Sequence, residues 1–198
     1  MIKMLFTDLE MCGLDWRKYG LHQISCIYCE DGVKKDEFDI HVRPNPNKEI
    51  SDDALAVSGV TREQVLAYPP MEEVHEWFCN RLGRYVNKYD KKDKMFFAGY
   101  NVASFDMPYL RSWFEDCGDK YFGSWFWSVP IDVMILAQQH LMENRPDMVD
   151  FKQGTVANYL GIPIEEEKLH DALYDIQVCK EIYERIRDPR RNEQTTLF

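Results

Sequence analysis

The chain reads Met-Leu-Phe-Thr-Asp-Leu-Glu-Met-Cys-Gly-Leu from residue 4 to residue 14. Its first half is an apolar run typical of a buried strand, and two acids, Asp8 and Glu10, stand where the run ends. Side chains two residues apart on a strand share a face, so we expect these carboxylates to lie side by side. Mg²⁺ and Mn²⁺ prefer such oxygen ligands and would relieve the repulsion between them. An Asp-x-Glu pair alone also occurs by chance, so further acids elsewhere in the chain are needed to support a metal site.

The remaining segments predict strands first and then strands alternating with helices. The predicted strands cover residues 4–9, 21–30, 33–43, 95–100 and 128–131, with a hairpin signal at Asp31-Gly32. Apolar residues at helical spacing predict helices over residues 51–57, 61–67, 71–88, 103–116, 132–142, 154–160 and 171–187. This order indicates an α/β domain with a mixed five-stranded sheet flanked by helices. We expect one domain over residues 1–187 and a polar C-terminal tail over residues 188–198.

The composition limits the class of protein. With 198 residues, of which 45% are hydrophobic and 14% aromatic, the chain can bury the core of one domain. It shows neither a signal peptide nor a run of about 18 uncharged apolar residues, so we expect a cytoplasmic protein that does not enter a membrane. The net charge of −10 argues against a large basic surface that holds nucleic acid by counterion release alone. It does not exclude an enzyme that gathers carboxylates around cations.

Six cysteines, at positions 12, 26, 29, 79, 117 and 179, are scattered through apolar segments. Their spacing matches neither a small disulfide framework nor a zinc site. The pair Cys26 and Cys29 lacks a second Cys or His pair at the usual distance. We therefore expect reduced cysteines in the core.

A second acidic position, Asp106, follows the fourth predicted strand and precedes a helical pattern. Ligands of open α/β sheets usually bind at such strand ends, which favours a role beside the first two acids. Asp106 could instead serve only as a helix cap, with Pro108 in the first turn.

A third acidic position lies at the start of the last predicted helix, where Asp175 follows His170 by five residues. This spacing could place a general base in the flanking loop beside a metal ligand on the helix. An isolated histidine at a helix start is more often structural than catalytic. The neighbouring Asp171 can be explained as an acid at the helix N-terminus, where the helix dipole favours negative charge.

Together the three segments resemble the three motifs of the DnaQ-like exonucleases with the DEDDh signature, a family with a ribonuclease H-like fold. The match runs from Phe6 to about Ile186, with the motifs in the family's order. The resemblance implies a 3′→5′ exonuclease that releases 5′-nucleoside monophosphates from single-stranded or frayed 3′ ends. It implies two Mg²⁺ or Mn²⁺ ions bound by Asp8, Glu10, Asp106 and Asp175, with His170 as the general base.

The resemblance also assigns substrate contacts. Leu14 is similar to the apolar residue that packs against the terminal base, and Asn101 to the asparagine near the substrate, with Met11 and Phe105 completing the expected contacts. The chain departs from many relatives in two places. Ser58-Gly59-Val60 replaces a His-Gly-Ile step, and Tyr100 stands where some relatives have histidine. These changes affect substrate contacts more than chemistry, because all five catalytic positions are filled.

The sugar preference is left open by the motifs. The first motif also resembles that of oligoribonuclease, whereas the second is closer to the DNA-proofreading branch. We expect DNA to be modestly preferred, with a 3′→5′ exoribonuclease acting on short RNA or RNA tails as the alternative. A non-catalytic nucleic-acid-binding module is the rival from another class. Similar enzymes also form homodimers, but the sequence identifies no interface.

Two further segments carry weaker signals. Residues 121–127 are unusually aromatic; their rings could stack on unpaired bases, but we favour burial in the core with one ring left to reach the substrate. The chain ends in Gln194-Thr195-Thr196-Leu197-Phe198, which resembles the Gln-x-x-Leu-Phe peptide that docks on bacterial sliding clamps. Gln194, Leu197 and Phe198 would be the clamp contacts, and a polar tail without a partner is the other interpretation.

Overall fold

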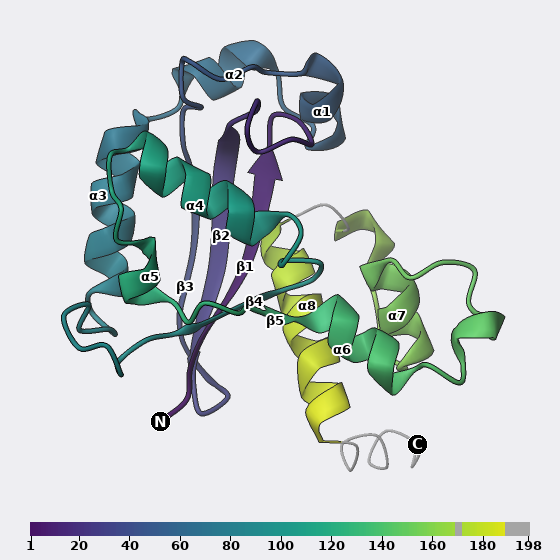
Figure 1. Ribbon diagram of the computed structural model, residues 1–198. Helices are drawn as coiled ribbons and strands as arrows, with labels where there is room; N and C mark the ends of the chain where they lie inside the picture. Colours follow the sequence, from purple (N-terminus) through teal and green to yellow (C-terminus); the bar gives the residue numbers. More distant parts are fainter. Residues whose placement is uncertain (169–171, 189–198) are drawn as a thin grey trace.

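The computed structural model describes residues 1–168 and 172–188, in which five strands form one mixed sheet (Figure 1). The strands are β1 (Lys3–Met11), β2 (Leu21–Glu30), β3 (Val33–His41), β4 (Phe96–Gly99) and β5 (Ile131–Asp132), in the order β3-β2-β1-β4-β5. β1 to β3 are antiparallel neighbours, whereas β1, β4 and β5 run parallel. The predicted hairpin is present, because Asp31 (φ 49°) and Gly32 (φ 85°) both adopt the left-handed geometry of a two-residue turn.

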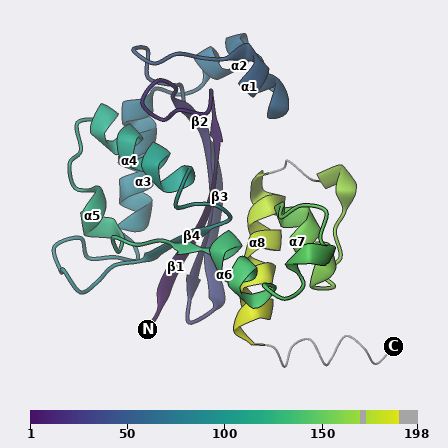
Figure 2. The ribbon, with the colours of Figure 1, turned by 45° about the vertical axis from the view of Figure 1, so that its right-hand side comes forward.

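Helices cover both faces of the sheet, as Figure 2 shows most clearly. They are α1 (Asp52–Val57), α2 (Arg62–Ala67), α3 (Met71–Leu82), α4 (Asp106–Asp116), α5 (Phe122–Trp125), α6 (Val133–His140), α7 (Gln153–Tyr159) and α8 (Ala172–Arg187). Short 3₁₀ turns lie at Arg145–Asp147 and Glu166–Lys168. α3, α4 and α5 lie on one face, α6, α7 and α8 lie on the other, and α1 and α2 lie beyond the end of β1 (Figures 1 and 2). The central strands β1, β2 and β4 are therefore largely buried between two helical layers, whereas most of the edge strand β3 is exposed or partly buried.

The residues of β1 alternate between two hydrophobic cores. Leu5 and Leu9 belong to the core beneath α3, α4 and α5, whereas Met4 and Phe6 belong to the core beneath α6, α7 and α8. A strand directs alternate side chains to opposite faces, so the even-numbered residues of β1 face α8. Asp8 and Glu10 continue this row beyond the apolar residues.

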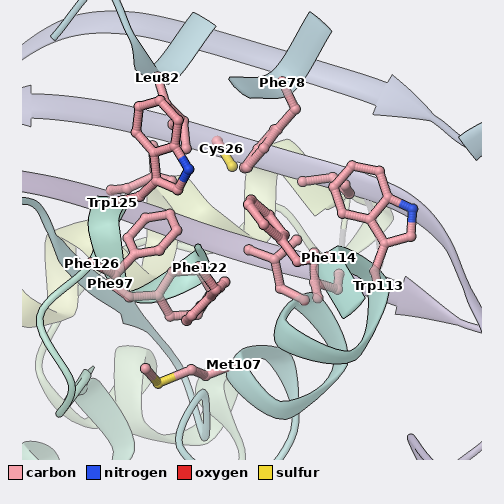
Figure 3. Close-up of a cluster of buried hydrophobic side chains, with 14 of the residues drawn as sticks. Cys26, Phe78, Leu82, Phe97, Met107, Trp113, Phe114, Phe122, Trp125 and Phe126 are labelled. Carbon is pink, nitrogen blue, oxygen red and sulfur yellow. The ribbon is translucent and has the colours of Figure 1, made fainter. Parts of the chain in front are cut away.

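The aromatic segment builds the first of these cores, as expected. Phe122, Trp125 and Phe126 are 1–4% exposed and pack with Phe97 and Phe114 (Figure 3). Tyr121, at 69% exposure, is the ring of this segment that is left at the surface.

Several predicted boundaries were wrong. The helix predicted over residues 71–88 ends at Leu82, because Gly83 begins a series of tight turns. The helix predicted from residue 103 begins at Asp106, and the aromatic segment contains α5, which the spacing did not predict. The six cysteines are free, with Cys79 and Cys117 only partly buried. Among the residues that the structure describes, no helix is both long and apolar enough to cross a bilayer.

Candidate active site

Four acids from the three predicted motifs come together between the sheet and α8. Asp8 and Glu10 lie on β1, Asp106 begins α4, and Asp175 lies on α8, on the side that also carries the buried Ala172 and Cys179. Burial raises the pKa of Asp8 well above its usual value, and the negative charges of Asp106, Glu10 and Asp175 raise it further. The structure thus brings the predicted carboxylates within mutual electrostatic reach.

A hydrogen bond joins the side chain of Asp106 to the strand that carries the first two acids. Its Oδ1 accepts a hydrogen bond of 2.9 Å from the backbone N–H of Leu9, beyond the last paired residues of β1 and β4. Burial raises the pKa of Asp106 to about 7, against the lowering effect of this hydrogen bond. The alternative interpretation as a helix cap was wrong: Phe105 occupies the cap position, and no side chain caps α4.

Asp132 fixes the loop between β4 and α4, a role that the sequence analysis missed. Its carboxylate accepts the N–H groups of Asn101 (3.1 Å) and Ala103 (3.0 Å) while it caps α6 through Met134 (3.0 Å). Asn101 needs this support because it adopts a left-handed conformation, with φ 60°. An aspartate just before a helix is a recognisable cap signal, but its long-range partners are not visible in a sequence.

The loop after β1 is held by contacts from α4 and from the segment that follows β3. Tyr109 donates to the carbonyl of Gly13 at 2.6 Å. Lys48 donates to Trp16 O (2.9 Å) and Ser112 Oγ (2.7 Å), and pairs with Asp116 at 3.0 Å. This anchored loop presents Leu14 with 83% of its surface exposed.

The departure at Ser58 brings a hydroxyl to the site. Ser58 Oγ donates to Glu10 Oε2, so the serine orients one of the four acids. Tyr100, the second departure, turns away and donates to the carbonyl of Phe151 at 2.6 Å. Met11 and Phe105 are both partly buried beside the acids.

A hollow of about 310 Å³ lies along α4, beginning with Met107, the residue after Asp106. Trp16, Met107, Pro108 and Arg111 contribute much of its lining. Its lining thus combines apolar side chains with one basic residue, Arg111, and one acidic residue, Glu115. His170, Gln194, Leu197 and Phe198 lie outside the described residues, and their assigned roles stay predictions.

The sequence matches the RNase_T family model, described as Exonuclease, over residues 5–183. The chain belongs to the RNase_T exonuclease family. The resemblance of its motifs to the DnaQ-like exonucleases is thereby confirmed. The matched range includes all four acids that the structure brings together.

This RNase_T exonuclease chain spans only part of the length of the proteins to which it is similar. The PolC-type DNA polymerase III of Thermotoga petrophila is 28% identical over 178 residues, which are 89% of this chain and 11% of the relative. E. coli Exonuclease I in complex with a dT13 oligonucleotide has a TM-score of 0.73 and 18% identity, over 98% of this chain and 43% of that chain. A second Exonuclease I structure gives a TM-score of 0.75 at the same identity and coverage. The likeness confirms the ribonuclease H-like fold.

The donor set of the exonuclease domain fits divalent cations. Burial and neighbouring acids raise the pKa of Asp8 and of Asp106, so the bare cluster is unfavourable, whereas Mg²⁺ or Mn²⁺ ions, which bind carboxylate oxygens, would stabilise it. Asp8, Glu10, Asp106 and Asp175 are the residues that would hold the ions.

This charge cluster predicts how stability depends on pH. The folded pKa values of Asp8 and Asp106 lie above those of an unfolded chain, so folding binds protons, and these two groups lower stability as pH rises from about 4 through about 7. We expect the metal-free melting temperature to fall between pH 6.5 and 8. Mg²⁺ should raise it at pH 8 by about 4–8 °C, equivalent to about 2 kcal/mol. Below pH 6.5 the buried His22, whose pKa is lowered to about 4, adds the opposite slope.

Differential scanning calorimetry with and without Mg²⁺ measures both effects. Equal melting temperatures at pH 8 with and without Mg²⁺ would contradict the assignment of these acids.

Proposed function

We propose that the chain is a metal-dependent 3′→5′ exonuclease that releases 5′-nucleoside monophosphates from single-stranded or frayed 3′ ends, with DNA preferred. The observation that carries this proposal is the convergence of Asp8, Glu10, Asp106 and Asp175 from three separate segments. A structural role alone gives no reason to collect four acids whose charges oppose one another.

The residues have distinct roles in this reaction. Two bound cations would supply a nucleophile from water and stabilise the charge on the departing 3′ oxygen. The four acids hold and space the ions, and Ser58 keeps Glu10 oriented. His170 takes the proton of the attacking water, a task suited to a pKa near neutrality.

Substrate binding is proposed for the exposed apolar surface beside the acids. Leu14 packs against the terminal base, because an 83% exposed leucine on an anchored loop is available for contact. Met11, Asn101 and Phe105 complete the proposed substrate contacts, and the hollow lined by Trp16 and Arg111 offers a face for a second base.

Support for DNA comes from the relatives, one a DNA polymerase and one solved with a DNA oligonucleotide. The alternative, an exoribonuclease acting on short RNA, would use the same acids. It differs from the proposed DNA exonuclease only in its substrate. A non-catalytic binding module would require at least one of these acids to be dispensable.

The test is hydrolysis of 5′-labelled single-stranded DNA and RNA of one sequence, with Mg²⁺, with Mn²⁺ and with chelator. We expect stepwise shortening from the 3′ end that requires metal and is faster on DNA. His170→Ala should slow it by about 10²–10⁴-fold, whereas His140→Ala, at an exposed position on α6, should have no effect. Faster cleavage of RNA would select the exoribonuclease, and no cleavage of either strand would select the binding module.

A further inference from the structure

A second group of potential metal ligands lies on the opposite helical layer, away from the four acids. His75 and Cys79 are one turn apart on α3, a spacing that directs both side chains to the same side of a helix. Asp119 follows the end of α4, which packs beside α3 (Figure 1). Nε2 of His75, Sγ of Cys79 and a carboxylate oxygen of Asp119 all lie within 4.8 Å of one another. No other group of three such ligands in the described part of the chain is this compact.

Asp119 is held in place by the turn that ends α4. Gly118, at φ 76°, allows the chain to reverse, and the N–H groups of Gly118 and Asp119 each donate at 2.9 Å to carbonyls of the last helical turn. One carboxylate oxygen, Oδ1, accepts the N–H of Tyr121 at 2.7 Å. The other, Oδ2, is thereby directed to His75 Nε2 at 3.4 Å.

The two distances from His75 Nε2 to the other ligand atoms match the edges of a zinc tetrahedron. Bonds of about 2.3 Å to sulfur and about 2.0–2.1 Å to nitrogen or oxygen give edges of about 3.6 Å for S···N and about 3.3 Å for N···O. Cys79 Sγ lies 3.6 Å from His75 Nε2, and Asp119 Oδ2 lies 3.4 Å from the same nitrogen. The three atoms thus surround one point.

Hydrogen bonds among the three side chains account for the positions of these ligand atoms less well than a bound cation does. One imidazole nitrogen is either a donor or an acceptor, so Nε2 cannot both donate to Asp119 and accept from Cys79. The site is also sheltered, because the His75 ring packs edge-on against Phe114 at 4.6 Å and Trp113 at 5.2 Å. The side chains of His75 and Asp119 remain 13% and 20% exposed, which leaves a path for an ion.

We propose that His75, Cys79 and Asp119 bind one Zn²⁺ ion, with a water molecule in the fourth position. The mixture of sulfur, nitrogen and oxygen ligands favours Zn²⁺ over Mg²⁺, which the four acids of the other site prefer. On binding, the Cys79 thiol loses its proton to solvent, a zinc–sulfur bond forms, and zinc-bound water is released. The ion connects α3 to the end of α4, the helix that carries Asp106 at its start.

Cobalt(II) reports on this site because only a thiolate ligand produces a sulfur-to-cobalt charge-transfer absorption. Metal-free protein titrated with Co²⁺ should show this band at one equivalent per chain and lose it when Zn²⁺ is added. The band should vanish in Cys79→Ser and persist in Cys117→Ser, whose thiol faces the Met71 carbonyl. It should also persist in Asp8→Asn, which weakens the other site.

Stability provides a second readout should Cys79→Ser fail to fold. Zn²⁺ at a hundredfold excess over its Kd should raise the melting temperature by about 5–10 °C. Asp119→Asn, which keeps an acceptor for Tyr121, should weaken Zn²⁺ binding by about tenfold or more. A charge-transfer band that survives Cys79→Ser, or that Cys117→Ser also removes, would overturn the proposal. So would the absence of any band in the native sequence.

Discussion

Asp106→Asn is expected to lower metal-dependent hydrolysis by on the order of 10³-fold while raising the melting temperature of the metal-free protein. The amide keeps an oxygen for the N–H of Leu9, so the geometry at the start of α4 is retained. It removes one negative charge from a cluster in which burial already raises the pKa of Asp106 to about 7. The cation loses a ligand, and the metal-free protein loses repulsion.

Two measurements on the same variant separate these effects. Single-turnover hydrolysis measures the loss of rate, and calorimetry in chelator at pH 8 measures the gain in stability. Asp53→Asn, at an exposed position on α1, is the matched control and should change neither. If Asp106→Asn is both inactive and less stable than the native sequence, Asp106 is a structural residue rather than a member of a metal site.

Gly99→Ala is expected to lower the free energy of unfolding by about 3 kcal/mol and the rate of hydrolysis by about 10- to 100-fold. A methyl group at Gly99 would lie 2.6 Å from the carbonyl oxygen of Thr7 and 3.1 Å from Val102 Cβ. The first contact is with backbone inside the sheet, which cannot rotate away. Relief of the clash must separate β4 from β1, and Thr7 directly precedes Asp8, so stability and catalysis decline together.

Urea denaturation measures the change in stability through the midpoint at constant slope. Gly123→Ala in α5 is the matched control, because an added methyl there meets no atom within 4 Å, and it should stay within about 0.5 kcal/mol of the native sequence. If Gly99→Ala is equally mild, β4 and β1 are not held as closely as the structure indicates.

The sequence predicted the parts of the site that depend on local pattern. Asp8 and Glu10 follow a strand whose period of two is visible in the residues themselves, and Asp106 and Asp175 stand beside recognisable helix starts. The family's motif order then grouped them. The fold class was predictable for the same reason, because the alternation of strands and helices is a local signal.

What the sequence could not predict depends on contacts between distant residues. Ser58 reaches Glu10 across 48 positions, and Lys48 reaches Ser112 across 64. The periodicity of residues along a strand or helix does not predict contacts between such distant residues. The interpretation of Asp106 as a cap was wrong for the same reason, since its partner, Leu9, lies 97 residues earlier.

The alternation along β1 makes the spacing of its residues as important as their identity. Met4 and Phe6 anchor the row that ends in Asp8 and Glu10. Inserting a single residue after Phe6 would therefore point both acids to the other face of the sheet, into the hydrophobic core beneath α4. Two inserted residues would restore the facing but carry the acids about 6.6 Å too far along the strand. Any change in the length of β1 that spares the acids must therefore fall before Met4 or after Glu10. The even spacing between Phe6 and the two acids is therefore a constraint of its own. A substitution leaves this spacing unchanged, whereas the insertion of a single codon destroys it.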